Sequence, residues 1–327
     1  MQETLMALVN QFKGKRVVTL ADLVADRFLY GEIARISREA PVLIINHHET
    51  KQVPGGGANA IHNIWAAGGT PYPIGVVGQD QEGEQLIDDF KRLGIDTTGI
   101  ESMPGYRTPT KMRVIGGLSH GYRQQIVRID WGKPFYDPKV VTRLRNKVKA
   151  AMKQADILMV SDYGYGAVSP EILPDLSDRS IPTILDSRFA LNRFLGVTAA
   201  LPNQSEVEAA LGVVIGDDRV RLEQAGRTLM KRLKQEALVI TRGKEGMALF
   251  ERRKKTVHIP VYGSDQVADV TGAGDTVMAI FTLAVAAGGT FEQAARLANY
   301  AGGLVVMKHG TCTVTSAELL QAVRSDS

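Results

Sequence analysis

The sequence predicts an α/β protein with a mostly parallel central sheet and a small antiparallel β lid. Short runs rich in Val and Ile alternate with helical patterns, which is typical of parallel strands joined by crossover helices. Two segments, 28–53 and 107–131, break this rhythm because apolar and polar residues alternate along them, as in antiparallel hairpins. Polar residues follow five of the other predicted strands, so a ligand site is expected at one edge of the sheet.

Strand and helix patterns follow one another along the chain. Val and Ile runs bounded by turn residues predict strands at 16–20, 72–77, 157–160, 182–185, 198–201 and 237–240. Apolar residues at helical spacing predict helices at 57–67, 83–93, 138–154, 205–211, 218–233 and 276–287. Turn signals in the second lid segment stand at Gly116, Gly117 and Gly121. Because there is no internal repeat or low-complexity tract, residues 1–327 are expected to form one domain that includes the lid.

Composition indicates a globular intracellular protein. The chain has 327 residues, of which 44% are hydrophobic, enough for a large core, and it has no long block of like charge. The single Cys312 excludes an internal disulfide and fits a reducing cytoplasm. The amino terminus has no apolar core of signal-peptide length, and no apolar run reaches the roughly 18 residues of a membrane span. We therefore expect a cytoplasmic protein with no membrane partner.

Charge and missing motifs narrow the ligand class. The net charge of +4 and an isoelectric point near 9.0 suit an anionic small substrate as well as nucleic acid. Basic and aromatic residues do not interleave and no nucleic-acid-binding motif is present, so the small substrate is favoured. The P-loop pattern and a Gly-x-Gly-x-x-Gly after the first strand are both missing. The adjacent His47 and His48 would face opposite sides of a strand, which argues against a metal site there.

Polar residues stand where five predicted strands end. In an open parallel sheet, ligands bind in the crevice outside the carboxyl ends of the strands. One such residue is a turn residue about as often as a ligand contact, but five at the same edge favour a site. The residues are Asp22, Ser161 with Asp162, Asp186, Asn203, and Thr241 with Arg242 and Gly243.

The segment 270–276, with the sequence VTGAGDT, combines a carboxylate with an anion cradle in one turn. Gly272 and Gly274 let the backbone bend and approach a ligand, and free N–H groups at a helix start attract phosphate-like anions. Asp275 would meet such an anion together with a second reactant, as a general base does. Its alternative role is to cap the following helix, which Asp does well.

A second glycine cluster lies between the two lid segments. Gly55, Gly56 and Gly57 precede a helix and allow a polar ligand to approach the backbone closely. Asn59 offers a donor and an acceptor to hydroxyl groups, and together with Asp26 it would form a site suited to a sugar. A lid over such a site would exclude water, as a phosphoryl-transfer enzyme requires. The alternative is an edge sheet used for packing or dimer contact.

Two strand-end junctions suggest a nucleotide and metal side. Asn203 and Glu206 place an amide and a carboxylate three residues apart, and Glu206 can act on Mg²⁺ through water. The alternative is a helix start that Ser205 caps. The turn 241–246 contains two glycines near which a nucleotide can lie, or it is a structural hairpin into residues 247–250.

Taken together, these residues resemble the ribokinase-like (PfkB) family of sugar kinases along nearly the whole chain. Residues 269–276, DVTGAGDT, look like the family signature DTTGAGDT, and the glycine cluster with Asn59 and the pair Asn203 and Glu206 match as well. The resemblance implies a ribokinase-like three-layer Rossmann-type sandwich and a kinase that uses ATP and Mg²⁺.

Within this family, the resemblance is closest to the branch that phosphorylates D-glycero-β-D-manno-heptose 7-phosphate at its anomeric hydroxyl, for the lipopolysaccharide core. The segments that carry this resemblance are 26–31, 35–42, 161–164 and 308–311. The nucleotidyltransferase domain often fused to that kinase is expected to be absent, because the chain ends soon after its last helix.

The resemblance also implies roles for individual residues. Asp275 is the expected catalytic base, and the backbone of Gly272, Ala273 and Gly274 is expected to stabilise the transferring phosphate. The expected sugar contacts are Asp22, Asp26, Gly55, Gly56, Asn59, Asp162 and Arg188. The expected ATP–Mg²⁺ side consists of Asn203, Glu206, Thr241, Gly243, Thr271 and Asn299. Asp269 and Thr271 align with positions that in some members bind a monovalent cation such as K⁺, and family analogy implies a homodimer through the lid strands.

Three positions depart from the family pattern. Ala21 stands in place of a glycine before the first strand-end aspartate. Tyr165 and Arg188 each replace a lysine that would meet phosphate, and Arg does not replace Lys without consequence. These changes leave the expected fold and ATP use intact but keep two alternatives open. One is a kinase for another sugar or sugar phosphate, and the other is a degenerate member that binds a ligand without catalysis.

Overall fold

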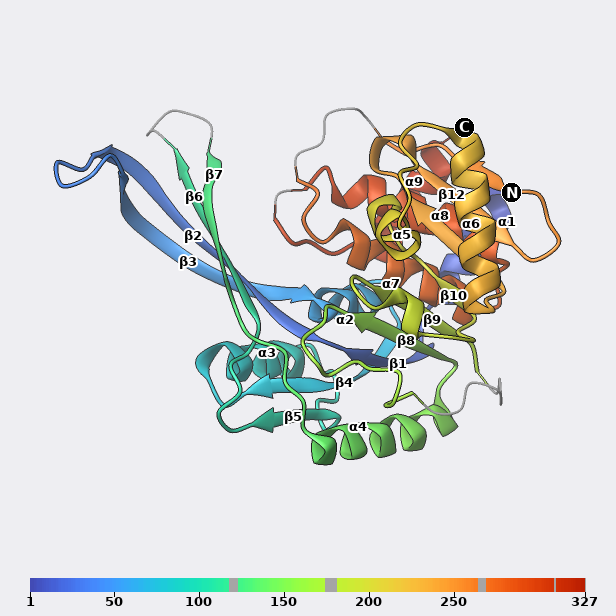
Figure 1. Ribbon diagram of the computed structural model, residues 1–327, viewed down its shortest axis with the longest axis horizontal. Coiled ribbons are helices and arrows are strands. Elements are labelled where there is room, and N and C mark those ends of the chain that lie inside the picture. Colours follow the sequence, from blue (N-terminus) through green and yellow to red (C-terminus); the bar gives the residue numbers. More distant parts are fainter. Residues whose placement is uncertain (118–122, 174–180, 264–268, 309, 327) are drawn as a thin grey trace.

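The computed structural model describes residues 1–117, 123–173, 181–263, 269–308 and 310–326, so the predicted turn at Gly121 lies outside the described residues, as does one residue of the family-like segment 308–311. Within the described part, the body is one sheet and a second sheet projects from it as a long arm (Figure 1). The body sheet has the strand order β13-β12-β11-β10-β9-β8-β1-β4-β5.

The body sheet is parallel from β5 to β11, as the alternation of strands and helices predicts, and β12 and β13 are antiparallel additions at one edge. The strands are β1 (Arg16–Ala21), β4 (Thr70–Gly78), β5 (Ile100–Met103), β8 (Ile157–Asp162), β9 (Thr183–Ser187), β10 (Ala199–Ala200), β11 (Ala237–Thr241), β12 (Met247–Glu251) and β13 (Val257–Ile259). All six strands predicted for the body are present, and no predicted end differs from the observed end by more than two residues.

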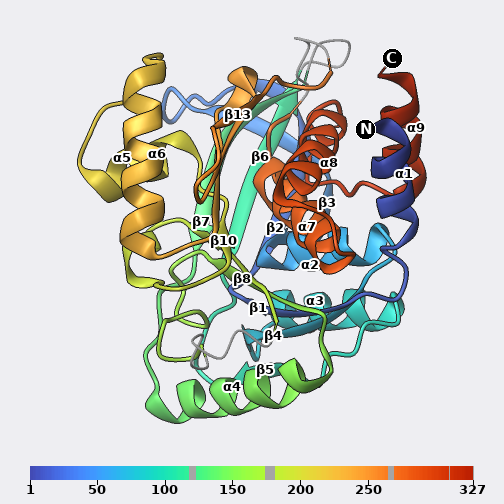
Figure 2. The same ribbon diagram turned by 90° about the vertical axis from the view of Figure 1, so that its right-hand side faces the viewer.

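Helices cover the sheet on both faces, because successive residues of each buried strand point to opposite sides. In β1, Val17 belongs to one core cluster and Val18 to the other. One face carries α1, α2, α7, α8 and α9, and the other carries α4 and α6 (Figure 2). The bounds are α1 (Gln2–Asn10), α2 (Gly57–Ala66), α3 (Gln81–Arg92), α4 (Pro138–Ala151), α5 (Gln204–Leu211), α6 (Arg219–Leu233), α7 (Ala273–Ala286), α8 (Phe291–Val305) and α9 (Ser316–Ser325).

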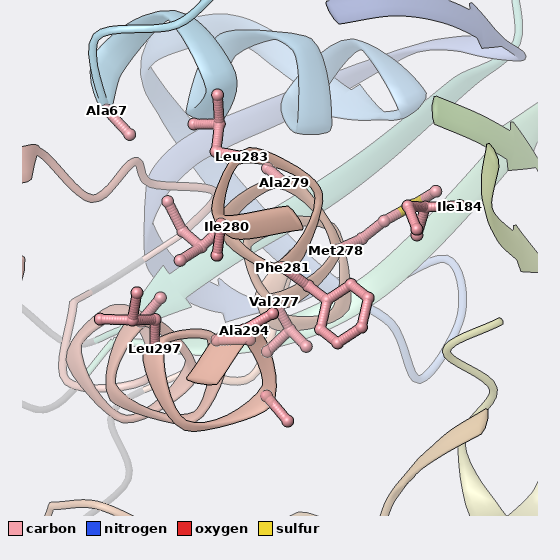
Figure 3. Packing of buried hydrophobic residues seen from close by; sticks show 14 of the residues in the cluster. Ala67, Ile184, Val277, Met278, Ala279, Ile280, Phe281, Leu283, Ala294 and Leu297 are labelled. Carbon is pink, nitrogen blue, oxygen red and sulfur yellow. The ribbon is translucent and has the colours of Figure 1, made fainter. Parts of the chain in front are cut away.

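Helix α7 is the central helix of one core, and it positions the segment that the sequence singles out. It is apolar on all sides and is buried from Asp275 to Ala284, as expected of a helix enclosed by other elements. Its Met278 points toward Ile184 of β9, and Leu283 points toward Ala67 at the end of α2 (Figure 3). The first turn of α7 is therefore held rigidly by the packing of the turns that follow it.

The lid consists of two hairpins, β2 (Leu23–Ile36) with β3 (Leu43–Gly56) and β6 (Thr110–Gly117) with β7 (Gln124–Trp131). Each hairpin is antiparallel, as predicted, and the two hairpins are joined by a parallel pairing of β2 with β6. The reason is that both hairpins leave the body at the carboxyl ends of parallel strands. Their first strands therefore run outward in the same direction. Hairpin β2–β3 also reaches back to Leu23 and Gly56, which brings its base into the body.

None of the helices in the described ranges is long and apolar enough to cross a membrane.

Candidate active site

Asp275 lies in the first turn of α7 with its carboxylate buried and hydrogen-bonded. The residue is 4% exposed, the Tyr163 hydroxyl donates to its Oδ1 at 2.6 Å, and Asn59 Nδ2 donates to its Oδ2 at 3.1 Å. Gly272, with φ 77°, is the N-cap residue of α7, and no side chain forms a capping hydrogen bond at this end of the helix. The alternative role of Asp275 as the helix cap is therefore wrong, because its carboxylate does not bind the N–H groups at the start of α7.

The environment of Asp275 suits a general base that works near neutral pH. Burial raises the pKa of this carboxyl from the ordinary 3.8 to about 6, while the hydrogen bonds from Tyr163 and Asn59 oppose the rise. A base is most effective when its pKa lies near the working pH, because it is then both ionised and able to take a proton.

We expect the pH profile of kcat/KM to report this pKa. Asp275 must be ionised to accept a proton, so kcat/KM should fall by about tenfold for each pH unit below about 6 and level off above it. The measurement is the initial rate of ADP formation, at acceptor concentrations well below KM, over a series of buffers. A rate that stays level down to about pH 4.5 would mean that a group other than Asp275 controls the acid limb.

The start of α7 offers backbone N–H groups to an anion. Ala273 N donates to Val270 O and Thr276 N to Gly272 O, whereas the N–H groups of Gly274 and Asp275 make no hydrogen bond to any residue in the described ranges. A Cβ added at Gly274 would meet no atom within 4 Å, so this part of the backbone borders open space. Unpaired N–H groups at a helix start favour a phosphate-like anion. This is the segment where the sequence predicts an anion cradle.

Asp26 is placed at the base of the lid by β2 and is fixed there by two partners. It is 4% exposed, Thr311 Oγ1 donates to its Oδ2 at 2.8 Å, and Arg113 Nη1 lies 2.9 Å from Oδ1 in an ion pair whose angles are not those of a hydrogen bond. A Cβ at Gly55 would lie 2.5 Å from Asp26 Cγ, so only glycine leaves room for this carboxylate. Gly56, with φ 50°, then turns the chain from β3 into α2.

Asn59 joins the two predicted halves of the site. It lies in the first turn of α2, 1% exposed, and its Nδ2 contacts both Asp275 Oδ2 and Gly272 O, the latter at 3.3 Å. A Cβ at Gly272 would lie 2.6 Å from that nitrogen, so the glycine also makes room for the amide. The residues predicted to bind the sugar and the predicted catalytic turn therefore lie next to each other.

Asp22 and Asp162 lie at the predicted ligand-binding edge of the sheet, but their carboxylates form hydrogen bonds with other groups of the protein. Asp22 accepts hydrogen bonds from the backbone N–H groups of Tyr163, Tyr165 and Ala167, each at 2.9 Å, and burial raises its pKa to about 7. Asp162 accepts hydrogen bonds from Gly164 N at 2.9 Å and from the Ser187 hydroxyl at 2.6 Å. We therefore revise their expected role as sugar contacts, because their oxygen atoms hold the loop after β8 in place.

The residues predicted to bind the nucleotide and Mg²⁺ include Asn203 and Glu206 at the start of α5. Asn203 caps this helix, and with Glu206 it forms a capping box, with distances of 2.9 Å and 2.8 Å. The expectation that Ser205 caps the helix is wrong. Asn203 also bridges to Thr241 at the end of β11, and Gly243 lies in the turn that follows with φ 53°. Because β12 runs back antiparallel to β11, this turn is a hairpin connection as well as a candidate nucleotide contact.

The sequence places Asp186 among the polar residues at strand ends but gives it no specific role. Burial raises its pKa well above the ordinary value, and the carboxylates of Glu206 and Asp275 raise it further. Burial also raises the pKa of Glu206. No group of three or more His, Cys, Asp or Glu residues able to hold a metal lies in the described ranges. A pair of carboxylates fits Mg²⁺, which binds one or two of them and fills its other positions with water and phosphate oxygens.

Asp269, Thr271 and Asn299 are also predicted site residues. Asp269 and Thr271 form hydrogen bonds within the turn before α7, and Asn299 lies apart from Asp186 and Glu206. The Asp269 carboxylate accepts from Thr271 N at 2.8 Å and from Gly310 N at 3.0 Å, so it fixes the turn before α7. Asn299 of α8 donates to Pro260 O at 2.8 Å and lines a separate cavity of about 600 Å³ beside β13 and α1. Within the described ranges, Asn299 forms no hydrogen bond with the other residues predicted to bind the nucleotide.

Two cations lie close to the ring of Tyr163, the tyrosine that donates to the Asp275 carboxylate. Lys111 Nζ lies 4.8 Å and Arg188 Cζ 6.0 Å from the centre of the Tyr163 ring. Neither side chain forms a hydrogen bond or ion pair with a described residue. Burial lowers the pKa of Lys111 and Arg188 lowers it further, while Asp26 and Asp275 act in the opposite direction. Sequence reasoning assigned Arg188 but not Lys111, which is one of several basic residues in a lid segment.

A family model for pfkB family carbohydrate kinases matches residues 15–318. The chain is 39% identical over 316 residues to the bifunctional protein HldE of Trichlorobacter lovleyi, which covers 94% of this chain and 62% of that protein. It is 39% identical over 309 residues to the bifunctional protein HldE of Geobacter sulfurreducens, with coverage of 93% and 62%. The chain thus spans less than two thirds of the length of these relatives.

Solved structures give the fold. Phosphofructokinase-2 from Escherichia coli in complex with potassium is similar with a TM-score of 0.75 and 18% identity, over 96% of this chain and 99% of that one. Arabidopsis thaliana ribokinase complexed with ribose and ATP is similar with a TM-score of 0.71 and 21% identity, over 95% and 99%. These likenesses confirm the predicted ribokinase-like architecture. The family match and the sequence relatives show that the chain belongs to the PfkB family of carbohydrate kinases and is a sugar kinase.

Proposed function

We propose that this sugar kinase transfers the γ-phosphoryl group of ATP to a hydroxyl of a sugar phosphate, with heptose 7-phosphate and its anomeric hydroxyl as the first choice. The observation that carries the proposal is the buried Asp275 carboxylate, which lies directly beside the unpaired N–H groups at the start of α7. A base and an anion cradle within one helical turn are what phosphoryl transfer to a hydroxyl requires.

In the proposed reaction, Asp275 accepts the proton of the acceptor hydroxyl while that oxygen forms a bond to the γ-phosphorus. The bond from the γ-phosphorus to the bridging oxygen breaks, and ADP leaves. The N–H groups of Gly274 and Asp275 and the helix dipole stabilise charge on the transferring group. Asp186 and Glu206 would hold Mg²⁺, directly or through water, and the ion would neutralise charge on the phosphates.

The proposed acceptor is anionic because of Lys111 and Arg188. Two cations beside Tyr163 that form no hydrogen bond or direct ion pair with a described residue leave an anion-binding position open. The phosphate of a sugar phosphate fits this position, and the resemblance to heptose 7-phosphate kinases suggests the sugar. The replacement of a family lysine by Arg188 keeps the positive charge but changes its geometry, so a different sugar phosphate is the alternative.

Replacing Lys111 with Met should weaken binding of the phosphorylated acceptor. The loss of one charge-assisted contact is expected to raise KM for the sugar phosphate by about 10- to 100-fold, with a smaller effect on kcat. The unphosphorylated sugar should show no such difference between the wild type and the variant. The matched control is Lys51→Met, since Lys51 lies on β3 with 61% of its side chain exposed and pairs with Glu49. Equal KM values for Lys111→Met and the wild type would rule out a contact with the acceptor phosphate.

The position of transfer can be read from the product. We expect ¹H and ³¹P NMR of a reaction with ATP and heptose 7-phosphate to show a new phosphate ester on the anomeric carbon, with the 7-phosphate retained. An ester on any other carbon would contradict the proposed regiochemistry while leaving the kinase assignment in place.

We also propose a cytoplasmic homodimer formed through the lid. Large apolar side chains are exposed on the lid strands and on the turn between β2 and β3, which suits a covered surface. They are Ile36, Val42, Leu43, Val127 and Ile129.

A monovalent cation at backbone oxygens of Asp269 and Thr271 remains part of the proposal, and the Asp269 carboxylate would keep that turn in shape. The proposed kinase domain is single and comprises residues 1–327, including the lid.

A further inference from the structure

We propose that Tyr163 is a positioning residue for phosphoryl transfer, one that holds the Asp275 carboxylate in its reactive orientation. This inference rests on the proposed function, because it assumes that Asp275 is the base. The Tyr163 hydroxyl lies 2.6 Å from Asp275 Oδ1, which is the shorter of the two side-chain hydrogen bonds to this carboxylate. The carboxylate can only accept when ionised, so the tyrosine is the donor.

The position of Tyr163 is itself fixed from several sides. Its backbone N–H donates to Asp22 Oδ2 at 2.9 Å, and the next turn of the loop is tied to the same carboxylate through Tyr165 and Ala167. Its ring lies so near the turn into α2 that a Cβ at Gly56 would be 3.3 Å from Tyr163 Cε2. The buried Asp22 takes no part in the proposed chemistry and has a structural function instead. It anchors the loop that aims the tyrosine hydroxyl at the base.

The two oxygens of the base have different partners. Oδ1 accepts from Tyr163 and Oδ2 accepts from Asn59 of α2, so the carboxylate cannot rotate without breaking both bonds. Each carboxylate oxygen has two lone pairs, and one on each remains for the acceptor hydroxyl. Preorganisation of this kind favours reaction because the base need not reorient in the transition state.

The hydrogen bond should also keep Asp275 ionised. Several groups face this carboxylate: Asp26 from β2 and Asp186 from β9 carry like charge, and Lys111 from β6 carries opposite charge. Burial raises the pKa of Asp275, and the hydrogen bond from Tyr163 is the largest influence that lowers it. Removing the hydroxyl should therefore shift the balance toward the protonated and inactive carboxyl group.

The test is Tyr163→Phe, which removes the hydroxyl but keeps the ring over which Lys111 lies. We expect the acid limb of kcat/KM to move upward by about one pH unit, because a hydrogen bond to a charged group contributes roughly that much to a pKa. On the plateau, kcat should fall by about tenfold as orientation is lost, with KM for ATP unchanged. Tyr72→Phe is the matched control. Its hydroxyl contacts Thr98 at 3.3 Å at the opposite end of the sheet, so neither the acid limb nor kcat should change.

A second readout needs no turnover. The carboxyl ¹³C resonance that disappears in Asp275→Asn identifies Asp275, and its titration should shift upward in Tyr163→Phe but not in Tyr72→Phe. An unchanged acid limb together with an unchanged ¹³C titration in Tyr163→Phe would overturn the proposal. If the wild type transfers phosphate to no acceptor, the proposed function fails, and the ¹³C titration still decides whether Tyr163 controls Asp275.

Discussion

Replacement of Asp275 by Asn should lower kcat by about 10²- to 10⁴-fold, the effect expected for removal of a positioned general base. The substitution keeps the size of the side chain. The introduced amide can still accept from Asn59 through its oxygen and donate to the Tyr163 oxygen through its nitrogen, so the packing around α7 is retained. What disappears is the ability to take a proton from the acceptor hydroxyl.

The same variant should fold at least as stably as the wild type at neutral pH. The pKa of Asp275 is about 6 in the folded protein against the ordinary 3.8, so the folded state binds more protons between these values. Stability contributed by this group therefore falls as the pH rises through that window, and the ionised carboxylate disfavours folding at pH 7. Asn removes this effect. We expect Tm at neutral pH to be equal to or above that of the wild type.

The control for this pair of measurements is Asp88→Asn on α3, where 68% of the Asp88 side chain is exposed. It should leave both kcat and Tm unchanged. A kcat for Asp275→Asn within a few-fold of the wild type would show that the base lies elsewhere. A large loss of Tm would mean that the ionised carboxylate supports the fold, and its assignment as a catalytic group would then need independent proof.

Replacement of Arg113 by Leu should destabilise the protein by about 3–5 kcal/mol, because it breaks a buried ion pair and leaves one charge without a partner. Arg113 and Asp26 have side chains that are 9% and 5% exposed, and the guanidinium group also lies 5.3 Å from the centre of the Phe28 ring. The expected measurement is a lower urea midpoint. Activity should fall as well, since Asp26 is an expected sugar contact.

Two comparisons isolate the buried pair. The double variant Arg113→Leu with Asp26→Asn should recover part of the lost stability, because no unpaired charge remains. Arg128 lies opposite Arg113 in the lid sheet and pairs with Asp130 at the surface. Arg128→Leu should therefore change stability by only about 0–1 kcal/mol. Equal losses for the Arg113 and Arg128 variants would contradict the idea that burial makes the Arg113 pair important.

The body of the fold could be predicted because its strands and helices differ in period and in residue type. The runs 16–20 and 157–160 are rich in Val, Ile and Leu, and both lie within observed parallel strands. The lid hairpins could be predicted as separate units from their alternation. Their parallel junction could not, because the pairing of β2 with β6 depends on where each hairpin leaves the body. The four-residue strand β5 is too short and too polar to stand out as a pattern.

The site could be predicted where it is made of local sequence. Asp275 with Gly272, and Asn59 with its glycines, are recognisable within a few residues, and the structure brings them together. Tyr163 and Lys111 could not be assigned, because their importance comes from contacts between distant segments. In sequence, a tyrosine after a strand is an ordinary packing residue and a lysine on a lid strand an ordinary surface charge.

The most direct test of the proposed function is release of ADP from ATP by the purified protein, with Mg²⁺ and a panel of sugar phosphates that includes heptose 7-phosphate. We expect one acceptor to give sustained turnover with one phosphate ester formed for each ADP, and Asp275→Asn to abolish it. If instead a sugar phosphate or ATP raises Tm but no acceptor gives ADP above the level seen with ATP alone, the chain binds its ligands without catalysis, and the assignment of Asp275 as a base is contradicted.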